Sequence, residues 1–233
     1  MTATVDSAAT IRPRFRTSLS ARLWTRRLGQ LYVGLVLYGV SAAMQVRAGL
    51  GLDPWDVLHQ GLATRLDRQI GTLTILVGVV VLLGWIPLRQ RPGLGTVSNV
   101  VVLGLAMNAT LAVLPAQHGY PARVTMLLSA IVLCGVATGM YISAGLGPGP
   151  RDGLMTGIAR RTGTSIRLTR TLIEVAVLAS GWLLGGSVGV GTVLYAVLIG
   201  PLAQIFLRVF RIRGLITESE CVDPKDAKAI AGT

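Results

Sequence analysis

The sequence predicts an all-α polytopic membrane protein with six transmembrane helices, arranged as two inverted three-helix repeats that each carry a short extra half-helix. Three observations lead to this fold class. Six apolar runs approach the length of a spanning helix, basic residues fall in alternate loops between them, and one phrase recurs 96 residues further along the chain. The composition agrees, because only 14% of the 233 residues are charged, against about 25% in soluble domains.

The six apolar runs set the expected order of elements. A helix needs about 20 mostly apolar residues to cross the hydrocarbon core of a bilayer. Several of the runs are slightly shorter and rich in glycine, which spanning helices tolerate because it lets neighbouring backbones approach closely. The expected spans are residues 29–46, 72–88, 96–114, 124–142, 168–185 and 190–207.

The distribution of basic residues predicts the orientation. Eighteen of the 22 Lys and Arg residues lie before the first span, after the second, after the fourth or after the sixth. Positively charged loops stay in the cytoplasm, so both termini are expected on the cytoplasmic side of a bacterial plasma membrane. The same loops account for the net charge of +12 without nucleic acid, because the basic residues do not gather on one amphipathic face.

The repeated phrase divides the chain into two units. "AGLGLDPWDVLHQGLA" at 48–63 and "AGLGPGPRDGLMTGIA" at 144–159 agree at nine of sixteen positions, and "GLGTV" at 93–97 and "GVGTV" at 189–193 keep the offset of 96. Three spans per unit is an odd number, so the second unit enters the membrane from the opposite side, as in an inverted repeat. The expected parts are a flexible cytoplasmic tail at 1–27, the first repeat at 28–114, an external loop at 115–123, the second repeat at 124–210 and a flexible cytoplasmic tail at 211–233.

Each copy of the phrase predicts a corner followed by a half-helix. Glycine supplies the positive φ needed just past a helix C-terminus, and Pro54 and Pro150 fit the first turn of a new helix. Asp53 is placed to cap the first of these helices. About 10–14 residues are too few to span, so each new helix is expected to be interfacial or re-entrant. The corner glycines are Gly49, Gly51, Gly145 and Gly147.

Three carboxylates are candidates for a substrate or ion path. Asp56 and Asp152 fall in the first turn of the two half-helices, where the helix dipole favours negative charge. They are either helix caps beside a tight corner or part of a path lined by broken segments, the usual place of a transporter site. Glu174 lies within the fifth span, where it either pairs with Arg170 four residues earlier or serves such a path.

Three further polar residues complete the candidate path. Asn108 and Gln204 are 96 residues apart in the third and sixth spans, where they either bond between helices or line a central cavity. Arg47, at the outer end of the first span, either extends toward the interface, binds an anionic group or pairs with Asp56. Other polar residues of the spans that can join such a lining are Tyr38, Gln45, Asn99, Tyr141 and Tyr195.

No metal, cofactor or enzyme chemistry is expected. Cys134 and Cys221 lack the spacing of metal ligands and do not cluster with either histidine. Cys134 lies in an apolar run and Cys221 in the polar C-terminal segment, which argues against a disulfide between them. The sequence also lacks a paired general acid and base of the kind that membrane enzymes use.

The phrases occur in an order that resembles a known family. "RLGQLYVGLVLYG", "AGLGLDPWDVLHQGLA" and "RPGLGTVSNVVVLG" in the first half, with "GLGPGPRDGLMTGIARRTG" and "GGSVGVGTVLYAVLIGP" in the second, resemble bacterial YczE/YyaS/YitT-type integral membrane proteins over residues 28–207. The resemblance implies a small polytopic plasma-membrane protein, and it assigns no catalytic residue.

Two functions are compatible with these features. The first is a small-molecule or ion transporter, permease-like, with alternating access between inverted repeats and with Asp56, Asp152 and Glu174 as charge carriers. The second is a non-transporting accessory or scaffold protein whose cytoplasmic arginines bind anionic lipid or a partner protein. The lipid bilayer is the expected partner in both, and nucleic acid in neither.

The inverted arrangement makes a prediction about topology. Single cysteines introduced near Gln60 and near Thr156 are expected to react from opposite faces of the cell membrane, the first from outside and the second from the cytoplasm. Labelling of intact cells with a membrane-impermeant maleimide measures this. Reaction of both positions from the same face would contradict the inverted repeat.

Overall fold

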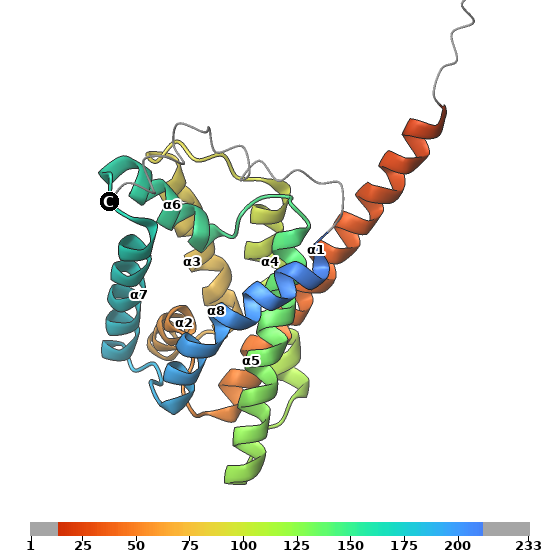
Figure 1. Cartoon of the computed structure of the whole chain (residues 1–233). Helices are drawn as coiled ribbons and strands as arrows, with labels where there is room; N and C mark the ends of the chain where they lie inside the picture. The colour runs from red at the N-terminus through yellow and green to blue at the C-terminus, as the bar shows by residue number, and fades with distance from the viewer. Residues whose placement is uncertain (1–13, 212–233) are drawn as a thin grey trace, which may run out of the picture.

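The computed structural model describes residues 14–211, and all regular elements within that range are α-helices (Figure 1). The longest helix is α1, and its N-terminal part projects beyond the bundle formed by the others (Figure 1). The helices are α1 (Arg14–Ala48), α2 (Pro54–Leu66), α3 (Ile70–Trp85), α4 (Leu94–Val113), α5 (Tyr120–Ser143), α6 (Pro150–Thr162), α7 (Ile166–Leu183) and α8 (Val190–Phe210).

The six expected spans correspond to α1, α3, α4, α5, α7 and α8, but not all of them are long and apolar enough to cross a membrane alone. Within the described residues four helices meet that requirement, namely α1, α4, α5 and α8. The pair α2 and α3, bent by 113° at the break between them, makes a fifth candidate. Helix α7 carries Arg167, Arg170 and Glu174 within 18 residues. The chain is therefore a multi-pass helical protein, and the number of six spans stays a prediction.

The tail boundaries differ from expectation at one end. Helix α1 begins at Arg14, so the part of the predicted flexible N-terminal segment from residue 14 to residue 27 is helical. Arg27 lies in this helix, and its guanidinium is held against the bundle because it donates hydrogen bonds to the carbonyls of Ala144 and Gly145. The predicted C-terminal segment lies, apart from Arg211, outside the described residues.

The structure has a short helix at each of the two positions where a half-helix is predicted. Helices α2 and α6 each have 13 residues, each begins at a proline, and their bounds are 96 residues apart. Asp53 caps α2 as expected, because its carboxylate accepts hydrogen bonds from the backbone N–H groups of Trp55 and Asp56, both at 2.9 Å. Capping satisfies backbone donors that have no partner inside the helix.

The glycine corners before α2 and α6 are also confirmed. Gly49 and Gly145 have φ of +60° and +63°, and Gly51 and Gly147 have φ of +115° and +124°. At Gly51 the need for glycine is steric as well as conformational, because an added Cβ would lie 2.7 Å from the backbone nitrogen of Gly189. The corner and the start of α8 are therefore in backbone contact.

Contacts between the halves recur in pairs at the offset of 96. The Arg27 guanidinium donates to the carbonyls that end α5, and Arg123 donates in the same way to Ala48 and Gly49 at the end of α1. The backbone N–H of Gly95 donates to Leu146, and that of Gly191 to Leu50, both at 2.8 Å. The halves thus hold each other through matching bonds, and neither packs as a separate unit.

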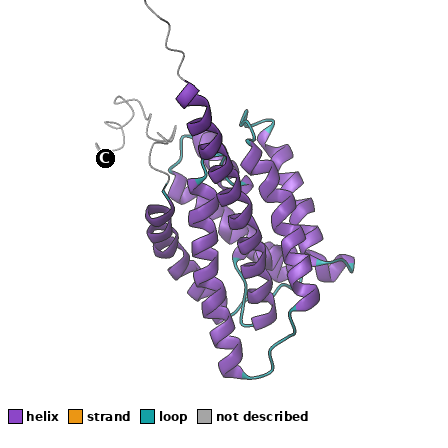
Figure 2. Ribbon diagram, turned by 90° about the vertical axis from the view of Figure 1, so that its right-hand side faces the viewer, coloured by secondary structure: helices purple, strands orange, loops and turns teal. Residues whose placement is uncertain are grey.

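Several helices of one half pack against helices of the other half. Helices α1 and α5 pack against each other along the centre, with α4 on α1 and α8 on α5 (Figures 1 and 2). Helix α2 packs more extensively on α7 of the other half than on its neighbour α3, and α6 packs on α3. Outward-facing positions carry large apolar side chains, among them Val193, Val197 and Ile205 on α8, as expected of a surface in contact with lipid.

Replacing Gly51 by alanine is predicted to destabilise the fold. The substitution forces a side chain into a left-handed backbone conformation and against the start of α8, which should lower the free energy of unfolding by at least about 2 kcal/mol. Gly29→Ala is the control, because no atom lies within 4 Å of the added Cβ and alanine favours a helix by up to about 1 kcal/mol. Unfolding of the purified variants in detergent measures both changes in free energy. If Gly51→Ala were as stable as the wild type, this account of the corner would be wrong.

Candidate functional site

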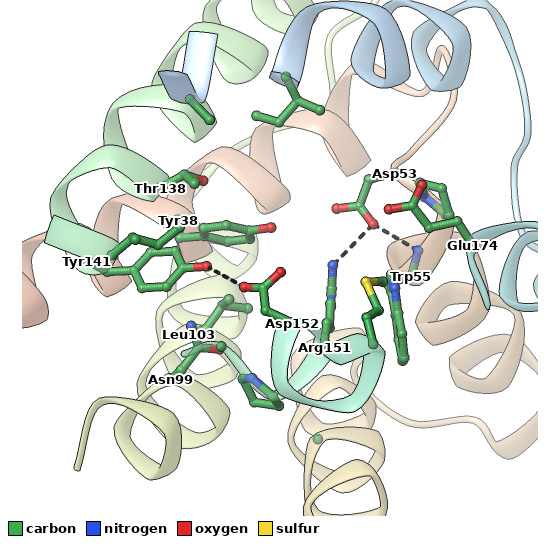
Figure 3. A pocket seen from close by; sticks show the side chains of 18 of the residues that line it. Tyr38, Asp53, Trp55, Asn99, Leu103, Thr138, Tyr141, Arg151, Asp152 and Glu174 are labelled. Atoms are coloured by element: carbon green, nitrogen blue, oxygen red, sulfur yellow. Dashed lines mark hydrogen bonds and ion pairs between the residues drawn. The ribbon is translucent and has the colours of Figure 1, made fainter. Parts of the chain in front are cut away.

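The half-helices begin at a cavity of about 330 Å³ between the two halves of the chain (Figure 3). Residues from all eight helices line it. Its polar and aromatic lining comprises Tyr38, Asp53, Trp55, His59, Thr74, Asn99, Thr138, Tyr141, Arg151, Asp152, Arg170, Glu174, Tyr195 and Gln204.

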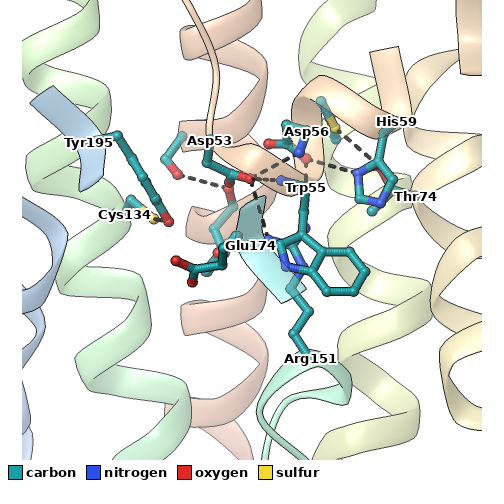
Figure 4. Close-up of polar contacts among 12 residues, drawn as sticks. Asp53, Trp55, Asp56, His59, Thr74, Cys134, Arg151, Glu174 and Tyr195 are labelled. Carbon is teal, nitrogen blue, oxygen red and sulfur yellow. Dashed lines mark hydrogen bonds and ion pairs between the residues drawn. The ribbon is translucent and has the colours of Figure 1, made fainter. Parts of the chain in front are cut away.

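An ion-pair cluster joins the two halves at the inner end of the cavity. Arg151, in the first turn of α6, reaches the start of α2, where its guanidinium lies 3.5 Å from Asp53 and 3.8 Å from Asp56 (Figure 4). Both carboxylates are almost wholly buried, at 2% and 1% exposure. The guanidinium also lies 5.1 Å from the centroid of the Trp55 ring, a cation–π arrangement. Two buried carboxylates therefore share one arginine from the other half.

A polar chain continues from Asp56 along the interior of the first half. The Oδ1 atom of Asp56 lies 3.0 Å from Nδ1 of His59, which in turn lies 3.2 Å from the Thr74 hydroxyl on α3 (Figure 4). The other carboxylate oxygen of Asp56 is buried and has no hydrogen-bond partner among the described residues. Buried polar atoms are usually paired, and this oxygen is an exception.

Asp152 follows Arg151 in the first turn of α6, but its surroundings are different. Its carboxylate points toward the tyrosines of α1 and α5 (Figure 3), and it accepts a hydrogen bond from Tyr141 at 3.4 Å. The Tyr141 and Tyr38 rings stack edge to face with centroids 6.2 Å apart. Among the described residues Asp152 forms no ion pair within 4 Å, in contrast to Asp53 and Asp56. It is therefore the lining carboxylate that lacks a close ion-pair partner.

The cavity opens between α7 and α8. Arg170 and Glu174 form the predicted ion pair on α7, at 2.9 Å, with 56% and 33% of their side chains exposed. Across the opening, Gly200 and Gln204 of α8 are exposed and also line the cavity. The lining is thus most exposed at α7 and α8 and most buried at Asp53 and His59.

The structure brings some predicted site residues together and separates others. Asp152, Glu174 and Gln204 line the cavity, and Asp56 lies directly behind Asp53. Asn108 is not part of the lining: its side chain accepts from the backbone N–H of Gly71 and donates to Thr72, which joins α4 to α3. Arg47 is also outside it and donates to the carbonyl of Leu111 near the end of α4.

The glycines and prolines of the phrase divide in the same way. Pro54 and Pro150 line the cavity at the first turns of α2 and α6. Gly49, Gly51, Gly145 and Gly147 stand in the corners before them, outside the lining. Their contribution to the site is to aim the two helix N-termini at one space.

Arg151 is the main site residue that the sequence interpretation missed. Counting it among the cytoplasmic loop arginines concealed its position, 96 residues after Trp55 and in the first turn of a helix. A cation is unfavourable at a helix N-terminus, so its presence there was the available signal that a carboxylate must lie nearby. His59 was missed too, although its spacing of three residues from Asp56 places both on one helix face.

No group of three or more potential metal-ligating side chains occurs within residues 14–211. Cys134 is a buried free thiol on α5, 3.6 Å from the Tyr195 hydroxyl. Cys221 lies outside the described residues.

The fold and the site define a class: a multi-pass, all-helical membrane protein with a charged cavity between two halves. Comparison with known proteins gives the family. A model of a family of unknown function (DUF6198) matches residues 25–208, and the chain belongs to that family. No solved structure matches it.

Curated relatives agree with this assignment. The chain is 40% identical to an uncharacterized protein of Haemophilus influenzae, over 83% of this chain and 91% of the relative. It is 34% identical to the uncharacterized membrane protein YczE of Bacillus subtilis, over 76% and 83%. It is 24% identical to the uncharacterized protein YyaS of the same organism, over 76% and 90%. These names confirm the YczE/YyaS part of the resemblance and an integral membrane location.

Removing the Arg151 guanidinium is predicted to destabilise the protein through the buried carboxylates it leaves behind. Arg151→Met should lower the free energy of unfolding by about 3 kcal/mol, the low end for breaking a buried pair, since the arginine itself is 24% exposed. Asp53→Asn keeps the α2 cap but removes one charge. The double variant should therefore lose less free energy of unfolding than the two single variants lose in sum. Unfolding in detergent measures this cycle, and additivity within about 0.5 kcal/mol would show that the pair is not coupled.

Proposed function

We propose that the protein is a small-molecule or ion transporter of the bacterial plasma membrane, built from two inverted repeats with six spans and cytoplasmic termini. In this proposal residues 28–114 and 124–210 alternate in closing the path to the cavity. The distribution of arginines and the constant offset of 96 support the topology. Inverted repeats with broken helices that meet at a central site are typical of secondary transporters.

The observation that carries the proposal is an asymmetry between equivalent helix pairs. Helices α3 and α4 pack closely, through Gly71 and Gly104, whose α-carbons leave no room for a Cβ. The equivalent helices α7 and α8 make no such packing, and the cavity opens between them. The first half is thus closed between α3 and α4, and the second half is open between α7 and α8. If the two halves exchanged these conformations, the cavity would close between α7 and α8 and open between α3 and α4.

The cluster around Arg151 supplies a contact that such a change must rearrange. It links the first turn of α6 to the start of α2, and these two helices belong to different halves. A substrate or proton that alters the charge of this cluster would act on the relative positions of the halves, because binding shifts a conformational equilibrium only through differential contacts. Asp152 is the residue after Arg151 and lines the same cavity.

A second candidate function has one observation in its favour. A groove of about 720 Å³ between the end of α3 and the C-terminal part of α6 contains Arg89, Arg160 and Arg161, next to the exposed side chain of Ile86. Clustered arginines beside apolar surface suit an anionic lipid headgroup. In this alternative the protein is a membrane accessory or scaffold protein that transports nothing.

Neutralising the cavity carboxylates is predicted to stop flux without unfolding the protein. Asp152→Asn should abolish solute-driven proton or ion flux in proteoliposomes, because it removes the unpaired lining charge. Asp56→Asn should reduce that flux by weakening the cluster with His59 and Arg151. Asp67→Asn is the control, because this exposed residue ends α2 away from the cavity. A fluorescent pH indicator inside the vesicles reports the proton movement driven by a panel of small solutes.

The two candidate functions separate in this experiment. Unchanged flux in both variants, with flux present in the wild type, would contradict the role of the carboxylates. Absence of any flux, together with loss of binding to phosphatidylglycerol vesicles when Arg160 and Arg161 are both replaced by glutamine, would favour the accessory function.

A further inference from the structure

We infer that the cavity binds a small organic cation, a molecule with a protonated amine and a hydrogen-bond acceptor, with the amine at Asp152 and the acceptor at the Trp55 indole N–H. This inference rests on the proposed function, because it names the substrate class of the same site. It comes from the charges that face the cavity, from one unpartnered donor in its wall and from the size of the space.

The charges of the cavity favour a positive group. Arg151 is shared between Asp53 and Asp56, and Arg170 is paired with Glu174. Asp152 is left with a single hydrogen bond, from Tyr141. Since the arginine nearest to Asp152 along the chain is already matched by two carboxylates, a cation that enters is not repelled by an unbalanced positive charge. An anionic ligand would meet an excess of carboxylates.

The aromatic lining favours an organic ammonium over a bare metal ion. Tyr38 and Tyr141 stand beside the Asp152 carboxylate (Figure 3), and aromatic faces attract ammonium groups. A metal ion such as Mg²⁺ or Ca²⁺ requires six or more oxygen ligands, and the described residues hold no cluster of ligating side chains suited to it. A single carboxylate with tyrosines around it suits a protonated amine.

Trp55 supplies the second half of the recognition. The residue is 95% buried, since its exposure is 5%, and its indole N–H has no hydrogen-bond partner among the described residues. Trp55 lines the cavity, but its Nε1 atom exposes less than 1 Å², so an acceptor on a ligand reaches this donor when the ring turns toward the space. An unmade buried hydrogen bond costs about 1–3 kcal/mol, so a ligand that carries an acceptor removes this penalty.

The volume limits the size of the ligand. About 330 Å³ is at the lower end of the range for small-molecule pockets, roughly 300–1,000 Å³. It suits a molecule of the size of a short amino alcohol. Ethanolamine, which has a protonated amine at neutral pH and a hydroxyl acceptor, is the smallest probe that carries both groups.

Calorimetric titration of the purified full chain in detergent tests the inference. Ethanolamine should bind, whereas ethylene glycol and glycolate, which replace its amine by a hydroxyl or a carboxylate, should not. Asp152→Asn should weaken ethanolamine binding by at least about tenfold, the loss of one charge-assisted hydrogen bond. Asp67→Asn should bind it like the wild type, and thermal unfolding of each variant checks that it is folded.

The acceptor is tested separately. Trp55→Phe keeps the ring beside Arg151 but removes the N–H, and it should weaken binding of ethanolamine while leaving binding of ethylamine, which has no hydroxyl, unchanged. No binding of ethanolamine at millimolar concentration, tighter binding of glycolate, or unchanged binding by folded Asp152→Asn would each overturn the inference.

Flux measurements keep this result distinct from the transport proposal. If ethanolamine fails to bind but another solute drives proton movement in proteoliposomes, the substrate class is wrong and transport stands. If ethanolamine binds but no solute drives flux, the cavity is a binding site for an organic cation in a protein that does not transport.

Discussion

The interaction on which the site depends is the contact of one arginine with two buried carboxylates of the other half. Arg151 lies against Asp53 and Asp56 at the point where both half-helices begin. Asp53 also caps α2 through the N–H groups of Trp55 and Asp56, so the same atoms that complete a helix also join the halves. A change in the charge of this cluster therefore affects local secondary structure and the packing of the halves together.

Close contacts elsewhere also hold the two halves together around this cluster. The corners at Gly51 and Gly147 place backbone directly against the starts of α8 and α4, and the paired bonds of Arg27 and Arg123 hold the ends of α5 and α1. Contacts of this kind are lacking between α7 and α8.

Local chemistry made part of the structure predictable. The half-helices and the glycine corners follow from residues whose backbone preferences are strong and which occur twice at one offset, and the Asp53 cap follows from its place directly before Pro54. The pair of Arg170 and Glu174 was predictable because it lies within one helix turn. The lining of the cavity was predictable only in part: Tyr38, Asn99, Tyr141 and Tyr195 belong to it, but Asn108 and Gln204 occupy equivalent positions in sequence and have different neighbours. Close packing of α3 on α4 gives Asn108 partners at Gly71 and Thr72, whereas the separation of α7 from α8 leaves Gln204 in the lining.

The exchange of half-helices has a consequence for how such a protein can arise and fold. Helix α2 packs more on α7 than on its own half, and α6 packs on α3 as well as on its own neighbour α7, so a single three-helix unit would leave its half-helix partly uncovered. Two units are needed before either is complete, as in a domain-swapped dimer. The chain thus has the geometry of an intertwined pair of similar units. Its first half must wait for synthesis of the second before its interior closes.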